Sequence, residues 1–260
     1  MKLTVLTENS AGAKLLAEHG LSYLIEHNGK TILFDTGHTD VFLKNAKMLD
    51  IDINNITDTI VLSHGHWDHG DGLQYIKDKT LIAHSGSFIK RFRKNDNSNI
   101  GLALSFNELK SRFNIITTKK PHYITDSIVF LGEIPRLNDF ESKTTTFIDD
   151  KGNPDFVPDD SALAIIDNNE LIVVTGCSHS GICNIVEYAK TTTGINNVKV
   201  VIGGFHLKLN NKQAQKTIEY FILHKILRLY PSHCTELPAL AAFYNTFKIE
   251  QLKTGKILTF

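Results

Sequence analysis

The sequence predicts an α/β fold in which two mixed β-sheets carry their helices on the outside. Short apolar runs typical of strands alternate with segments of helical spacing, and their order is mixed rather than strictly alternating. Two tight-turn signals join neighbouring runs into hairpins. The 260 residues, 42% of them hydrophobic, contain no linker rich in Pro, Gly or Ser and no internal repeat. We therefore expect a single domain that spans residues 1–260.

The strands are predicted from apolar runs that end in turn residues. Asn28-Gly29 and Asn168-Asn169 are predicted to form the two tight hairpin turns. The runs that contain the predicted strands are residues 2–7, 21–37, 59–65, 79–86, 114–120, 124–132, 161–176 and 198–207.

The helices are predicted from apolar residues at helical spacing or from a preceding capping residue. The predicted helices cover residues 38–49, 70–78, 85–94, 181–193, 211–229 and 236–247. The basic run at 90–94 is then a solvated helix face, or the rim of a phosphate site. The longest polar, turn-rich stretch, residues 138–160, is predicted to be a loop or a lid.

Charge and composition limit the partners that we expect. Lys plus Arg equals Asp plus Glu at 28 each, so no overall basic field exists to hold nucleic acid or an anionic membrane. The sequence contains neither a secretory signal nor an apolar run of about 20 residues, which predicts a cytoplasmic protein. Three cysteines without a CxxC pair argue against a disulfide framework and a four-cysteine zinc site. The expected partner is a small-molecule substrate, and the oligomeric state stays open.

The stretch "SHGHWDHGDG", residues 63–72, places three histidines and two aspartates directly after the apolar run "TIVL". His64 and His66 lie two residues apart, so both can reach one metal ion. Asp68 and His69 follow at once and suit a second ion, since paired metals lie about 3.5–4 Å apart in hydrolytic sites. The alternative is a polar turn with incidental histidines. Four donors within six residues favour the metal site.

The segment "HGHWDH" fits the HxHxDH motif, and the chain thereby resembles the metallo-β-lactamase superfamily of metal-dependent hydrolases. The segment "ILFDTG" at 32–37 is similar to the early strand of that superfamily, which ends in an Asp. Several further segments resemble the subfamily named after an archaeal dihydropterin-ribofuranosyl-aminobenzene 5′-phosphate synthase: "SHGHWDHGDGL", "LGEIPR", "DDSALAII", "LIVVTGCSHSGI", "VIGGFHL" and "PSHCTE". The resemblance implies a four-layer αβ/βα sandwich, two mixed sheets flanked by helices.

The remaining metal ligands are expected at distant strand ends. The run "LIVVTGCSHSG" brings Cys177 and His179 to one strand end, where superfamily members commonly supply an Asp and where Cys177 occupies the aligned place. We favour His179 as the ligand, with Cys177 as a softer alternative that would favour zinc or iron. A capping histidine and a buried apolar cysteine are the alternatives. His233 in "LYPSHCTE" is similar to the final metal histidine of the superfamily, and Cys234 is then expected to point away.

Five further residues are expected to support the site or the substrate. His206 suits substrate binding or the support of a ligand, and a packed histidine is the alternative. Asp35 and Asp160 are expected to accept hydrogen bonds from the metal loop or to orient a ligand histidine, although either aspartate alternatively lies in a solvated turn. Glu133 and Arg136 are expected to meet an anionic substrate, with a surface salt bridge as the alternative.

These residues predict a hydrolase with two divalent metal ions: zinc, with iron or manganese as alternatives. Asp68 would hold a metal-activated water that attacks a small ester, lactone, thioester or phosphoester, with phosphorylated and heterocyclic compounds among the candidate substrates. The resemblance adds a second hypothesis, a transferase that condenses a dihydropterin with an aminobenzene-type nucleophile and releases pyrophosphate. A third is a non-hydrolytic di-iron or binding module. No GxSxG elbow, phosphate loop or dinucleotide motif offers a competing chemistry.

Overall fold

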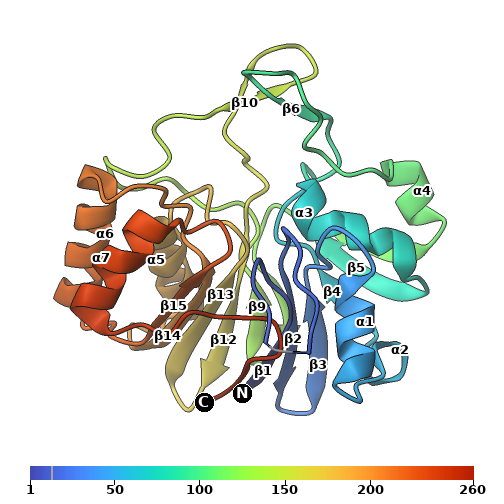
Figure 1. Ribbon diagram of the computed structural model, residues 1–260, viewed down its shortest axis with the longest axis horizontal. Helices are drawn as coiled ribbons and strands as arrows, with labels where there is room; N and C mark the ends of the chain where they lie inside the picture. The colour runs from blue at the N-terminus through green and yellow to red at the C-terminus, as the bar shows by residue number, and fades with distance from the viewer. Residues whose placement is uncertain (13) are drawn as a thin grey trace. The chain divides into compact units, whose positions relative to one another are not determined.

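The computed structural model describes residues 1–12 and 14–260, and its chain divides into two compact units (Figure 1). Unit 1 comprises Met1–Lys119, Thr146–Asp155 and Leu252–Phe260. Unit 2 comprises Lys120–Thr145 and Phe156–Gln251. Each unit has its own sheet and its own apolar core. The single-domain assignment of the chain stays a prediction.

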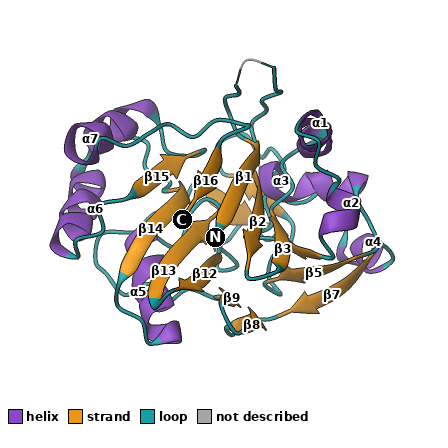
Figure 2. Cartoon of the chain, turned by 90° about the horizontal axis from the view of Figure 1, so that it is seen from below, coloured by secondary structure: helices purple, strands orange, loops and turns teal. Residues whose placement is uncertain are grey.

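Unit 1 is built on a seven-stranded mixed sheet in the order β16-β1-β2-β3-β4-β5-β7 (Figure 2). The strands from β16 to β3 pair antiparallel, whereas β3, β4, β5 and β7 pair parallel. The carboxyl ends of β3 and β4 therefore lie at the same edge. The strands are β1 (Lys2–Thr7), β2 (Ser22–His27), β3 (Lys30–Phe34), β4 (Thr59–Val61), β5 (Lys79–Ala83), β7 (Phe113–Thr117) and β16 (Ile257–Thr259).

The helices of unit 1 are short. They are α1 (Val41–Met48), α2 (Ile53–Ile56), α3 (Trp67–Gly70), the 3₁₀ helix η1 (Asp71–Tyr75) and α4 (Phe106–Lys110). The core joins α1 to the sheet through Leu33, Phe42 and Ile60, all fully buried. The predicted helix at 38–49 is thus confirmed, whereas the one at 70–78 is in fact the pair α3 and η1.

A three-stranded sheet of β6 (Arg91–Arg93), β10 (Phe147–Asp149) and β11 (Pro154–Asp155) also belongs to unit 1. The prediction of a helix over 85–94 is wrong, because residues 91–93 are extended and pair with β10. Of the basic residues in this run, Lys90, Arg93 and Lys94 are exposed, and Arg91 is the exception. The side chain of Arg91 is fully buried, and its Nε lies 3.1 Å from Oδ2 of buried Asp155. The segment 138–160 accordingly contains strands and is not one continuous loop.

Unit 2 has a six-stranded sheet in the order β15-β14-β13-β12-β9-β8. Strands β12 and β13 form the predicted antiparallel hairpin, and β13, β14 and β15 run parallel. The carboxyl ends of these three strands therefore share one edge. The strands are β8 (His122–Thr125), β9 (Ile128–Phe130), β12 (Ala162–Asp167), β13 (Glu170–Thr175), β14 (Val198–Gly204) and β15 (Leu229–Ser232).

Three helices, α5 (Ile182–Thr193), α6 (Lys212–Leu223) and α7 (Leu237–Phe247), lie together beside this sheet in Figure 1. Phe205, Phe221 and Phe243 pack in the core between them. The predicted helices 181–193 and 236–247 are confirmed. The predicted helix 211–229 is too long, because α6 ends at Leu223 and residues 229–232 form β15.

Both predicted hairpin turns are confirmed by their backbone angles. Asn28 and Gly29 have φ values of 46° and 77°, and Asn168 and Asn169 have 52° and 63°. Positive φ at both central residues matches the twist of the flanking strands, and Asn and Gly tolerate it best. Among the described residues, no helix combines the length and the apolar character that a membrane span requires.

We expect Arg91→Leu to lower the free energy of unfolding by about 3–5 kcal/mol, because it leaves the Asp155 carboxylate buried without its cation. Urea denaturation measures this loss. The matched control is Arg93→Leu on the same strand, where the side chain is exposed. Replacing both Arg91 and Asp155 by leucine should recover most of the stability. A single variant as stable as the control would contradict the importance of this ion pair.

Candidate metal centre

The loop that carries the HxHxDH motif follows β4 at the carboxyl edge of the parallel strands in unit 1. His66 is the last extended residue before α3, which begins at Trp67. Gly65 passes so close to residue Ser87 that a Cβ would lie 1.8 Å from the carbonyl oxygen there. Only glycine fits at this point, and the close passage lets the histidines on either side converge.

Three imidazoles of this loop are buried and gathered together. Nε2 of His64 lies 3.0 Å from Nδ1 of His66, and the ring centroids of His64 and His69 are 4.3 Å apart. Burial, followed by repulsion from His69 and His66, lowers the pKa of His64 well below its ordinary value. His64 is therefore neutral, which is the form of imidazole that binds a metal.

Asp35 holds the loop from the neighbouring strand end. Its Oδ1 accepts a hydrogen bond from the backbone N–H of Ser63 at 2.7 Å, and its Oδ2 accepts one from the Ser63 hydroxyl at 2.7 Å. The same Oδ2 lies 2.7 Å from Nδ1 of His69. Both carboxylate oxygens are engaged with the loop, as the sequence predicted for a supporting rather than a ligating residue.

These contacts also fix which ring nitrogens are available. Nδ1 of His69 donates to Asp35, which leaves Nε2 of His69 as the ring nitrogen that can bind a metal ion. The Ser63 hydroxyl donates to Asp35 and thus accepts from Nδ1 of His64, 2.9 Å away. His64 and His69 thereby both keep Nε2 for a metal ion. A cluster of buried imidazoles that includes the neutral His64 fits a divalent metal ion.

Asp68 lies beside a histidine that the sequence did not single out. Nε2 of His19 is 3.2 Å from Oδ2 of Asp68, and the Leu21 N–H donates to the backbone carbonyl of Asp68 at 3.1 Å. The indole ring of Trp67 contacts the rings of His19 and His38. A single histidine before a strand carries no motif, so only the packing of 19–21 against the loop reveals His19.

The carboxyl edge of β13, β14 and β15 in unit 2 carries a second set of candidate residues. Cys177 and His179 follow β13, His206 follows β14, and His233 follows β15. The rings of His179 and His206 lie 4.3 Å apart between centroids. Cys177, His206 and Cys234 form a group whose ligand atoms all lie within 4.8 Å of one another. Cys234, expected to point away from the metal site, is thus part of a cluster of its own.

Asp160 supports the segment that carries His179. Its Oδ2 accepts a hydrogen bond from the backbone N–H of Ser180 at 2.9 Å. Burial of the carboxyl group raises the pKa of Asp160 to about 6. Asp160 therefore orients the backbone next to His179.

The two candidate substrate residues differ in their surroundings. Arg136 donates from Nε to the Ser142 hydroxyl at 2.8 Å and from Nη2 to the carbonyl oxygen of Phe156 at 2.6 Å. These bonds tie together two parts of unit 2 and take up much of the guanidinium group. Glu133 follows β9 and is half-buried. Their roles toward a substrate stay predictions.

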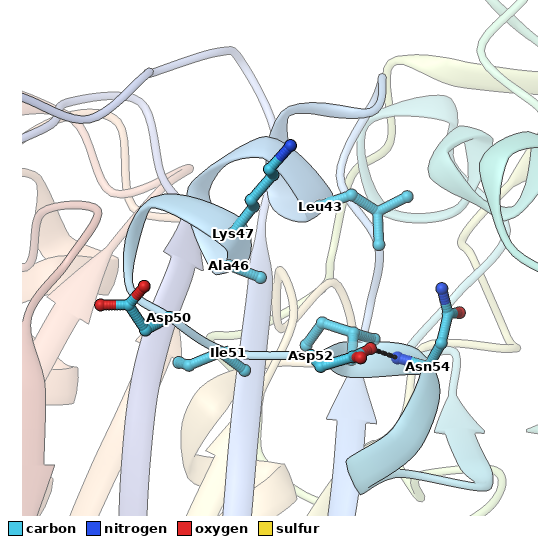
Figure 3. A pocket seen from close by; sticks show the side chains of 8 residues that line it. Leu43, Ala46, Lys47, Asp50, Ile51, Asp52 and Asn54 are labelled. Atoms are coloured by element: carbon cyan, nitrogen blue, oxygen red, sulfur yellow. Dashed lines mark hydrogen bonds between the residues drawn. The ribbon is translucent and has the colours of Figure 1, made fainter.

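Two cavities in unit 1 differ in their relation to these residues. One of about 330 Å³ is lined by His38, Trp67, Asp71, Asn99, Gly101 and Ala103, directly beside the metal loop. The other, of about 480 Å³, lies by α1 and α2 and is lined by Leu43, Ala46, Lys47, Asp50, Ile51, Asp52, Ile53 and Asn54 (Figure 3). Neither cavity is lined by a predicted site residue, but Trp67 and Asp71 of the first one flank Asp68 and His69 in the chain, so the first cavity is the better substrate candidate.

Residues 16–87, which include the whole HxHxDH loop, match the family model of the metallo-β-lactamase superfamily. The solved structure of Tm1679, described as a metal-dependent hydrolase of the β-lactamase superfamily, shares 28% identity and a TM-score of 0.89, with 100% of this chain and 99% of that chain covered. The chain belongs to the metallo-β-lactamase superfamily. The predicted mixed α/β fold of this superfamily is confirmed, and membership implies an enzyme that binds divalent metal.

Two proteins of Methanocaldococcus jannaschii are similar over nearly their full lengths. One is the 7,8-dihydropterin-6-methyl-4-(β-D-ribofuranosyl)-aminobenzene-5′-phosphate synthase, 35% identical over 288 residues with 100% of this chain and 97% of the relative covered. The other, an uncharacterised protein, is 34% identical over 264 residues, with 98% and 99% covered. The predicted resemblance to the synthase subfamily is confirmed.

We expect Asp35→Asn to weaken metal binding about 10–100-fold, because an amide no longer accepts all three hydrogen bonds that orient His69 and Ser63. Asn suits the left-handed backbone at this position, where φ is 56°, so the substitution adds no backbone strain. Competition with a chelating dye measures the dissociation constant. Asp58→Asn, at an exposed carboxylate paired with Lys30, is the control. Equal affinity in both variants would refute the orienting role.

Proposed function

We propose that this metallo-β-lactamase superfamily member is a binuclear metal-dependent hydrolase of a small ester, lactone or phosphoester. The observation that carries the proposal is the group of buried imidazoles in which His64 is neutral and in which Asp35 and Ser63 engage Nδ1 of His69 and of His64. Such a group suits zinc, with iron or manganese as alternatives. The proposed ligands are His64, His66 and His179 for one ion, and Asp68, His69 and His233 for the other.

Each proposed residue has a distinct task in the reaction. Divalent ions held by these ligands would lower the pKa of a coordinated water toward about 7 and would thereby supply hydroxide at neutral pH. The Asp68 carboxylate orients that nucleophile and accepts its proton. His19, 3.2 Å from Asp68, is placed to share this proton. The Asp35 carboxylate keeps His69 in the tautomer that ligates through Nε2.

The cavity beside the loop favours a flat, partly polar substrate. Trp67 offers an aromatic ring, and Asp71 offers a largely buried carboxylate that accepts from the Ala103 N–H through one oxygen at 2.7 Å. Burial raises the pKa of Asp71, which strengthens any hydrogen bond that this group makes to a ligand. A volume of about 330 Å³ lies at the lower end of the range of small-molecule pockets.

The second candidate function is a transferase like the similar synthase of Methanocaldococcus jannaschii, favoured by 35% identity over the full chain. In that case, the bound metal ions would stabilise a leaving pyrophosphate instead of activating water. A non-hydrolytic di-iron or binding module is the third possibility. For all three functions we propose a small-molecule partner, no nucleic acid or membrane, and a cytoplasmic location.

We expect the proposed hydrolytic ligands to hold about two equivalents of zinc, iron or manganese per chain in protein purified without added metal. His66→Ala removes a ligand and should lower this content and abolish activity, whereas His122→Ala, on strand β8, should change neither. Elemental analysis by mass spectrometry gives both values. Protein that binds no metal even on titration would refute the hydrolase and the transferase together.

Isotope labelling should distinguish hydrolysis from transfer once phosphoesters, lactones and pterin precursors have been screened. For a hydrolase, we expect one atom of heavy oxygen from labelled water in the acid or phosphate product and none in the alcohol that leaves, because water is the nucleophile. For the transferase, pyrophosphate is released and no solvent oxygen enters the condensed product. Mass spectrometry of the products measures the label, and unlabelled water is the control.

A further inference from the structure

The cysteine–histidine cluster of unit 2 lies at the ends of three neighbouring strands. Cys177, His206 and Cys234 each follow one of the parallel strands β13, β14 and β15 by one or two residues. Because parallel neighbours end at one edge, residues about 30 positions apart in the chain meet there. Their ligand atoms all lie within 4.8 Å of one another.

The backbone around this cluster is shaped to bring the three side chains together. His206 has a φ of 50°, and so does His233, the residue directly before Cys234. A positive φ is uncommon for residues other than glycine. A Cβ on Gly204 would lie 2.5 Å from Sγ of Cys234, so only glycine leaves room for this thiol. Residues other than glycine keep a left-handed backbone conformation only where the surrounding structure holds them in it, and such residues are concentrated at functional sites.

The cluster also contains a polar atom that the protein does not satisfy. Nδ1 of His206 is buried and makes no hydrogen bond within the described part of the chain. Sγ of Cys234 lies 3.4 Å from the carbonyl oxygen of Cys177, a weak contact for a thiol. A buried nitrogen beside two thiols is costly unless it has a partner, and a metal ion is one that all three groups can share.

We propose that Cys177, His206 and Cys234 form a separate binding site for one thiophilic metal ion, with zinc as the physiological occupant. Two thiolates and an imidazole are a known zinc ligand set that leaves the fourth position for water or another ligand. Zn–S bonds of about 2.3 Å and Zn–N bonds of about 2.0–2.1 Å place tetrahedral ligand atoms about 3.4–3.8 Å apart. Closing from 4.8 Å or less therefore shortens each separation by at most about 1.4 Å.

This site goes beyond the proposed function, because none of its ligands belongs to the proposed hydrolytic set. The ring of His179, a proposed hydrolytic ligand, lies 4.3 Å from the ring of His206. An ion that joins the ends of β13, β14 and β15 would therefore fix the segments that carry His179 and His233. We assign it a structural role in orienting those two histidines.

The decisive experiment titrates chelator-treated protein with cobalt(II), which gives near-ultraviolet sulfur-to-metal absorption only when thiolates bind it. We expect this absorption in the unaltered protein and its loss in Cys234→Ser, together with about one equivalent of bound metal. Cys183→Ser is the matched control, because the third cysteine lies on α5 among core residues. His206→Asn serves as a second variant should Cys234→Ser fail to fold.

Two outcomes would overturn the site. The first is the absence of sulfur absorption in the unaltered protein, or a Cys177–Cys234 disulfide whose reduction restores no metal binding. The second is absorption that disappears in Cys177→Ser but persists in Cys234→Ser and His206→Asn, which would assign Cys177 to the hydrolytic ions. The proposed hydrolytic site and the proposed thiolate site can be refuted independently of each other. If His66→Ala keeps its full metal content while Cys234→Ser loses one equivalent, the hydrolytic site is wrong and the thiolate site stands.

Discussion

The metal loop depends on one buried carboxylate, that of Asp35. Taking this group out of water carries a large free-energy cost, which only a complete set of hydrogen bonds offsets. The backbone and hydroxyl of Ser63 and the ring of His69 supply that set. Stability and chemistry are thus linked, since the bonds that permit the burial of Asp35 are the same bonds that orient the imidazoles.

The same geometric rule organises the candidate residues of both units. In each unit, side chains with donor atoms follow parallel strands, β3 and β4 in one and β13 to β15 in the other. Close approach of these strand ends requires glycine at Gly65 and Gly204, where a Cβ would collide with neighbouring atoms. Polar loops on a rigid apolar sheet can hold several ligands in place without using the core itself.

The features that the sequence predicted well are those determined by local rules. The turns at Asn28-Gly29 and Asn168-Asn169 follow from backbone preference, and the loop of His64 to His69 follows from a compact spacing of donors. The segment 85–94 was predicted incorrectly because the spacing of its apolar residues resembles a helix. Its real conformation depends on Asp155, more than sixty residues away, which neutralises Arg91 in the interior. Pairing over such distances leaves no local pattern.

His19 and Cys234 show a second reason why the site was only partly predictable. Neither residue stands in a spaced motif, and each acquires a partner only when separate strands meet. Cys234 was expected to point away from His233 because neighbours on a strand alternate in direction. The left-handed φ of His233 ends that alternation, so the rule for extended chain no longer applies. Strained backbone of this kind cannot be read from residue types.

Glu141 limits which part of the polar segment 138–160 can act as a lid. The Glu141 carboxylate is buried and accepts hydrogen bonds from the backbone N–H groups of Cys183 and Asn184, both at 3.0 Å, so it caps the first turn of α5. The Asn184 side chain in turn accepts from the N–H of Leu137 at 2.9 Å. Opening residues 137–141 as a lid would expose the N-terminus of α5, which begins three residues after His179. These residues are better suited to holding His179 in place than to admitting a substrate, so any closing movement belongs to the later part of the segment.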